Sequence, residues 1–213
     1  MLLARLGLWL ERRPLLRFVL SVAALLPAMF GIWYAAGAAL SAPAALLAES
    51  VLQLWIPEFV AQFQRNGAVL TVVSSYGEAA GAFFPAEEVG NRIGFSVNTR
   101  ILSYSMPFFA ALYFSTPLRG GLDRFAWGFI TLWLLLAVGI VATVLKDFML
   151  TMGAAFLDNA SVPTADIIAL AYQFSTLMVP PLAPVLLWAY AASDSPAFSA
   201  LLSSAPRPAH SSD

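Results

Sequence analysis

The chain has 213 residues, of which 60% are hydrophobic and only 11% charged, and its mean hydropathy is +0.79. Soluble domains contain roughly 25% charged residues, so this composition argues against a soluble globular enzyme. The formal net charge of -1 gives no basis for electrostatic binding to nucleic acid. Because the chain has no cysteine, disulfides, thiolate metal sites and a cysteine nucleophile are excluded.

Long stretches without charge predict where the chain crosses a membrane. A helical span needs about 20 apolar residues, because the hydrocarbon core is about 30 Å thick. Four uncharged stretches meet or approach that length: 18–48, 101–118, 125–145 and 167–193. The second is the shortest and contains Pro107. We therefore predict an all-α transmembrane protein, an integral bundle of four helices near 16–39, 100–117, 125–146 and 167–191.

The first of these stretches allows two interpretations. A basic N-terminus precedes an apolar run that ends near Ala36-Gly37-Ala38, which is the layout of a cleavable secretory signal. However, the run is longer than the about 7–15 apolar residues of such a signal. Trp33 and Tyr34 near its end also suit a membrane–water interface. We therefore favour an uncleaved membrane anchor.

The distribution of basic residues predicts the orientation, because short cytoplasmic loops are enriched in Lys and Arg. With a cytoplasmic N-terminus, the inside segments carry most of the arginines: Arg5, Arg12, Arg13, Arg119, Arg124 and Arg207. The outside segments are longer but hold only Arg65, Arg92, Arg100 and Lys146. Both termini are therefore predicted to be cytoplasmic.

The connection between the first two helices is the one sizeable predicted extramembrane region. Residues 43–63 carry apolar side chains at helical spacing, which predicts an amphipathic helix at the membrane surface with Trp55 near the headgroups. Pro57 is expected to bend or interrupt it. A helix packed over its own bundle explains the pattern equally well.

Beyond Asn66-Gly67 the pattern changes to that of β-strands. Residues 68–73 (AVLTVV) are rich in β-branched side chains and bounded by turn residues, and in 93–98 Phe95 and Val97 alternate with Ser96 and Asn98. We predict that the two runs pair as an antiparallel hairpin. Two strands alone are marginally stable in water, so this hairpin needs the amphipathic helix, the membrane surface or a partner beside it.

The chain is thus predicted to contain four parts. The first joins the basic N-terminus to the first span, the second is the extracytoplasmic helix and hairpin, and the third holds the remaining spans. The last part is rich in Ser, Ala and Pro and is predicted to be a disordered cytoplasmic tail. The boundaries are 1–39, 40–99, 100–192 and 193–213.

Sequence motifs for catalysis or cofactor binding are absent. The chain lacks the phosphate-binding glycine loops and the nucleophile elbow, and its lone histidine, His210, lies in the tail. We therefore predict no catalytic, cofactor-binding or metal-binding residues. The predicted span interiors also contain no charged residue, which argues against a transporter component.

One enzymatic hypothesis remains. Ser103 and Ser105 are predicted at the outward end of the second helix, on the same side as Lys146 at the end of the third. A partly desolvated lysine can activate a serine, as in Ser–Lys acyl-transfer sites. Against this hypothesis, Asp147 adjoins Lys146 and favours the charged ammonium.

Small residues on the first helix offer a possible contact face. Gly31, Ala35 and Ala39 recur every four residues, which allows another helix to approach closely. Packing within the chain's own bundle explains the same spacing.

Two segments resemble the exosortase H-associated membrane proteins. The first is Val97-Asn98 followed by residues 103–107 (SYSMP), and the second is residues 171–174 (AYQF) leading to 179–188. The resemblance implies a multi-pass protein of the bacterial inner membrane that belongs to a protein-sorting system. It also implies an exosortase or its sorted substrate as the partner, besides the lipid bilayer. Because exosortases use Cys, Arg and His, a chain without cysteine is expected to be a non-enzymatic accessory protein.

Overall fold

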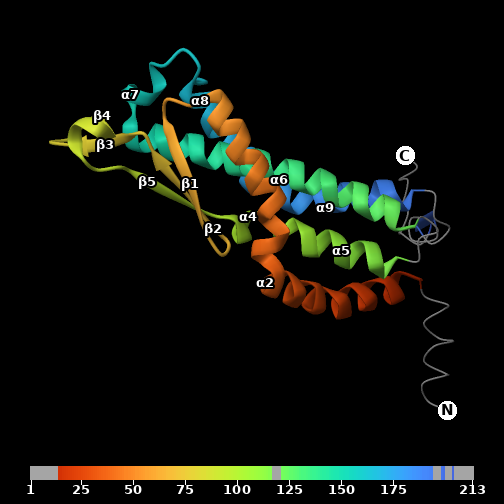
Figure 1. Cartoon of the computed structure of the whole chain (residues 1–213). Coiled ribbons are helices and arrows are strands. Elements are labelled where there is room, and N and C mark those ends of the chain that lie inside the picture. The colour runs from red at the N-terminus through yellow and green to blue at the C-terminus, as the bar shows by residue number, and fades with distance from the viewer. Residues whose placement is uncertain (1–13, 117–120, 194–197, 200–202, 204–213) are drawn as a thin grey trace, which may run out of the picture.

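The computed structural model describes residues 14–116, 121–193, 198–199 and 203. The predicted basic N-terminus, Arg119, and nearly all of the predicted tail with Arg207 and His210 lie outside the described residues. Helices lie side by side at one end of the molecule, and a small sheet occupies the other end (Figure 1).

The described residues form longer helices, single-turn helices and strands. The longer helices are α2 (Pro14–Trp55), α5 (Ser105–Ser115), α6 (Leu122–Met152), α8 (Ala165–Gln173) and α9 (Val179–Ala192), with the π-helix η1 (Phe174–Met178) between the last two. Single-turn helices are α3 (Ala86–Val89), α4 (Thr99–Leu102) and α7 (Ala154–Leu157). The strands are β1 (Val60–Asn66), β2 (Val69–Ser74), β3 (Tyr76–Ala79), β4 (Ala82–Pro85) and β5 (Gly94–Asn98).

Three helical segments among the described residues are long and apolar enough to cross a membrane. They are α2, α6 and the continuous segment from α8 through η1 to α9. The prediction of four spanning helices is not confirmed, because the described part of the second predicted span forms α4 (Thr99–Leu102) and α5 (Ser105–Ser115) with a turn between them. With 11 residues, α5 is about 16 Å long, roughly half the hydrocarbon core. Pro107 has no N–H, and the Ser103 carbonyl accepts from Met106 N instead.

The first helix continues well beyond its predicted end. At 42 residues, α2 is about 63 Å long, about twice the thickness of the hydrocarbon core. It changes direction near its middle (Figure 1). Pro43 lies inside the helix there and offers no N–H to the carbonyl of Ala39, which explains a bend at this place. The second half of α2, up to Trp55, packs on α6.

The predicted strand pairing is confirmed within a larger sheet. Strand β2 pairs with β5 antiparallel, with Leu70 opposite Val97 and Val72 opposite Phe95. A third strand, β1, pairs with the other edge of β2. Strands β3 and β4 form a separate hairpin.

The prediction of a helix through residue 63 is wrong beyond Trp55. Pro57 provides no backbone donor, so the helical hydrogen bonds do not continue past it. Gly67, with φ of 60°, then allows the tight turn that folds β1 back onto β2.

The neighbour that the predicted hairpin requires belongs to the same chain. One face of the sheet buries Leu70, Val72, Phe95 and Val97. Below it, the rings of Phe59, Phe148 and Phe156 contact one another with centroids 4.9–6.0 Å apart. Phe95 lies 4.7 Å from Phe148. The sheet is therefore fixed to the end of α6 and to α7, and the third strand adds further support.

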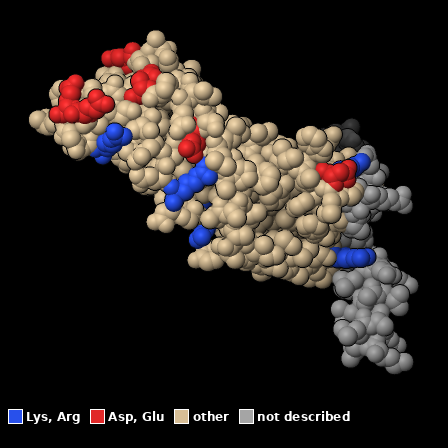
Figure 2. All heavy atoms as spheres, in the orientation of Figure 1, with Lys and Arg blue, Asp and Glu red and all other residues tan. Residues whose placement is uncertain are grey.

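The charged residues divide the molecule into two regions. We call the helical region without charged side chains the charge-free belt; it comprises residues 18–39, 105–115, 125–145 and 167–192. The sheet layer comprises residues 43–99 and 146–166. Figure 2 shows a wide uncharged band between the charges at the two ends. On α6 the uncharged run is about 31 Å long, which matches a hydrocarbon core.

Candidate functional site

A polar junction connects the belt to the sheet layer. The indole Nε1 of Trp33 donates to Ser103 Oγ at 3.0 Å. The hydroxyls of Ser41 and Thr99 share a hydrogen bond of 2.9 Å, and Thr99 Oγ1 also donates to the carbonyl of Ala68 at 2.8 Å. These bonds tie α2 to α4 and to the β1–β2 turn. No local pattern in the sequence pairs Trp33 with a residue seventy positions away.

Arg100 lies at the same boundary. Its guanidinium carbon is 4.5 Å from the centre of the Tyr34 ring, a cation–π contact. A Cβ at position 37 would lie 3.4 Å from Arg100 Nε, so glycine there leaves room for the arginine. The buried Nε has no hydrogen-bond partner within the described part of the chain. The arrangement holds a positive charge against the edge of the belt.

The structure gives other partners to the residues of the Ser–Lys hypothesis. The Lys146 ammonium pairs with the Asp147 carboxylate and lies 4.8 Å from the centre of the Tyr172 ring. Ser103 Oγ accepts from Trp33, and Ser105 is buried. Within the described residues, no hydrogen bond joins Lys146 to either serine. Lys146 and Ser103 therefore each contact a residue other than the one that the hypothesis requires.

The small-residue face of α2 points away from the bundle. Gly31, Ala35 and Ala39 are all exposed. A Cβ placed on Gly31 meets no atom within 4 Å. Within the described residues, this face is therefore not used for packing inside the chain.

The far end of the sheet layer is acidic. Exposed Glu78, Glu87 and Glu88 lie on β3 and α3, and Figure 2 shows acidic side chains gathered at this end. A shallow pocket of about 280 Å³ opens nearby, lined in part by Glu58, Tyr76 and Arg92. No group of three or more His, Cys, Asp or Glu among the described residues is arranged to hold a metal ion.

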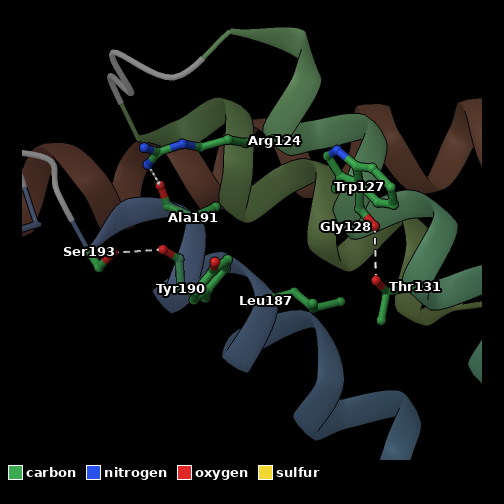
Figure 3. A pocket seen from close by; sticks show the side chains of 8 residues that line it. All are labelled: Arg124, Trp127, Gly128, Thr131, Leu187, Tyr190, Ala191 and Ser193. Carbon is green, nitrogen blue, oxygen red and sulfur yellow. Dashed lines mark hydrogen bonds between the residues drawn. The ribbon is translucent and has the colours of Figure 1, made fainter.

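A larger pocket lies at the opposite end of the molecule. It has a volume of about 610 Å³ and lies between the first turns of α6 and the last turns of α9 (Figure 3). Its lining residues are Arg124, Trp127, Gly128, Thr131, Leu187, Tyr190, Ala191 and Ser193. The sequence offers no pattern for it, because the two sides are about sixty residues apart.

The long apolar helices that form the charge-free belt identify this chain as a membrane protein. It matches the family described as exosortase H-associated membrane protein over residues 12–195, and it belongs to that family. The comparisons with curated proteins and with solved structures found no match. The two segments that resemble this family lie around the polar junction and in the continuous helical segment from α8 through η1 to α9.

Proposed function

We propose that the chain is a non-enzymatic accessory protein of an exosortase sorting system. It presents the sheet layer to exosortase H or to a protein that this enzyme sorts. The observation that carries the proposal is the family match over residues 12–195. The firm attachment of the sheet to α6 supports it, because a surface that is held rigidly loses little conformational entropy on binding.

The proposed topology is multi-pass in the bacterial inner membrane, with both termini in the cytoplasm and the sheet layer outside. The first residues of α2, the start of α6 and the end of α9 lie at the same end of the molecule (Figure 1). Arg17 and Arg124 are at that end, in agreement with the bias of arginine toward the cytoplasm. In this topology α4 and α5 together return the chain through the belt.

In this arrangement, the second half of α2 is suited to lie on the outward-facing surface of the inner membrane. Leu47, Val51 and Leu54 are exposed on one side of the helix. Glu49 faces the sheet, where its carboxylate accepts from Arg65 at 2.9 Å. An apolar side beside a charged side is the pattern of a helix that lies in the interface.

Co-purification in mild detergent tests the accessory role. In cells that carry exosortase H, we expect the tagged chain to retain the exosortase or a sorted protein, and deletion of the chain to impair sorting. Absence of both effects would contradict the proposal.

The double variant Glu87→Gln, Glu88→Gln tests whether the acidic end of the sheet layer makes the contact. Asp166→Asn, at the start of α8, is the matched control.

A further inference from the structure

Gln173 places a polar side chain on the outer surface of the charge-free belt. It is the last residue of α8 and is exposed. Within the described residues, no group forms a hydrogen bond with its amide side chain. Leu170, Phe174 and Leu177 around it are 57–67% exposed. The amide, with two N–H donors and an acceptor oxygen, is thus set among side chains that face lipid, whose tails provide neither donor nor acceptor.

The contact between η1 and α6 shows how deep this amide lies. A Cβ on Gly139 would be 3.9 Å from the carbonyl oxygen of Ser175, so these two residues are at the same level. Gly139 lies about 10 Å along α6 from Lys146, where the uncharged run of that helix ends. Gln173 is about 3 Å closer to the sheet layer than Ser175. The amide therefore lies about 7 Å inside the belt, which is within the hydrocarbon core in the proposed topology.

The backbone just beyond Gln173 also lacks donors. In a regular α-helix, the carbonyls of Thr176 and Leu177 accept from the N–H groups four residues later. Those positions are Pro180 and Pro181, which have no N–H. The nearest N–H, that of Val179, is already used across the π turn. No side chain in the described part of the chain donates to either carbonyl. The Leu177 carbonyl lies on the lipid-facing side of the helix, because Leu177 is 67% exposed.

A partner must supply a donor to the Leu177 carbonyl and a polar group that pairs with the Gln173 amide. The two positions are about one helical turn apart on the same face. A second copy of the chain matches them poorly, because two copies in one membrane share one orientation. Their two-fold axis sets Leu177 opposite Leu177, an acceptor against an acceptor. A helix of another protein with Ser, Thr, Asn or Gln side chains one turn apart matches both levels.

We propose that the exposed face of α8 and η1, with the Gln173 amide and the Leu177 carbonyl, binds a membrane-spanning helix of exosortase H. That helix carries hydroxyl or amide side chains at these two levels, because hydrogen bonds of this kind join helices in membranes. The exposed side chains of Phe174 and Met178 pack against the apolar part of the same helix. The identity of the partner rests on the proposed function, to which this face adds a contact within the belt.

Binding of exosortase H to the full-length chain tests the amide. The dissociation constant of the two purified proteins is measured by fluorescence titration in mild detergent. Gln173→Leu keeps the bulk of the side chain but removes its donors and acceptor, and is expected to weaken binding about three- to tenfold. Gln173→Asn keeps an amide and is expected to retain most of the affinity. Thermal unfolding of Gln173→Leu should match that of the natural chain, since the amide has no partner among the described residues.

Photocrosslinking in cells that carry exosortase H tests the face. The photoreactive residue p-benzoylphenylalanine in place of Leu177 is expected to crosslink to the exosortase. The matched control has the same residue in place of Val138, which is 57% exposed on α6 and adjoins Gly139, at a similar depth. That control is expected to give no crosslink to the exosortase.

Failure of this contact can be told apart from failure of the proposed function. An unchanged dissociation constant in Gln173→Leu, or equal crosslinking from positions 177 and 138, would overturn the contact within the belt while the accessory role stands. Crosslinking of position 177 to a second copy of the chain would assign the face to a homodimer and overturn it as well. If the natural chain does not bind exosortase H at all, both the accessory role and this contact fail.

Discussion

The charge-free belt and the sheet layer are stabilised by different means. In the belt, large apolar side chains such as Leu134, Val138 and Leu186 remain 51–67% exposed, which lipid solvates and water would not. In the sheet layer, aromatic rings are fully buried beneath strands whose outer residues are polar. The belt therefore depends on close fit between helices, whereas the sheet layer depends on burial of apolar surface.

The largest effect is expected in the sheet layer, at Phe148. Its side chain is fully buried and its ring contacts Phe59, Phe95 and Phe156. Phe148→Ala should lower the free energy of unfolding by about 3–5 kcal/mol, from lost burial and a cavity. Thermal unfolding in detergent and limited proteolysis of residues 43–99 measure this loss. Leu150→Ala, at a side chain that is 70% exposed on the same helix, is the control; equal losses would refute the comparison.

The belt should respond instead to an added methyl group. A Cβ on Gly128 would overlap the ring of Phe109, which is fully buried. Gly128→Ala should therefore destabilise the contact of α5 with α6 by about 1–3 kcal/mol, as overpacking does. Gly31→Ala meets no atom within 4 Å and should cause no loss. Thermal unfolding in the same detergent distinguishes them; a larger loss at Gly31 would show that the exposed face of α2 is a contact.

The smallest effect is expected at the ion pair between α2 and β1. Arg65 Nη2 and Glu49 Oε2 are 2.9 Å apart, with side chains 33% and 27% exposed. Glu49→Gln should cost about 0.2–1 kcal/mol, since partly exposed pairs are screened by water and salt. Unfolding measured at low and high salt checks this, because the difference between the variant and the natural chain should shrink as salt rises. An undiminished difference would contradict the electrostatic explanation.

The features predicted well from the sequence are those that follow from the pattern of neighbouring residues. The uncharged run 125–145 identified α6, although the helix extends to Met152 because the chain beyond Lys146 continues under the sheet. The alternation of Phe95 and Val97 with polar residues identified β5 and its buried face. Pairing with β2 then followed from its β-branched sequence.

The features missed depend on contacts between distant residues. Phe59 and Phe63 fit helical spacing with Trp55, and only pairing with β2 shows that Phe63 lies in a strand. Strand β3 is four residues of mixed type without alternation. The two sides of the α6–α9 pocket and the Trp33–Ser103 bond likewise join segments that no local pattern relates. Sequence periodicity reports the face that an element buries, but not the partner that covers it.

The most direct test of the account is the side of the membrane on which the sheet layer lies. The chain has no natural cysteine, so a single cysteine at Glu87, an exposed position on α3, gives a clean label site. A membrane-impermeant maleimide should label Glu87→Cys from the periplasmic side of cells with a permeabilised outer membrane, while Leu134→Cys within the belt stays unlabelled. Labelling of Glu87→Cys only after the inner membrane is opened would contradict an outward sheet layer, and equal labelling of Leu134→Cys would contradict a belt buried in lipid.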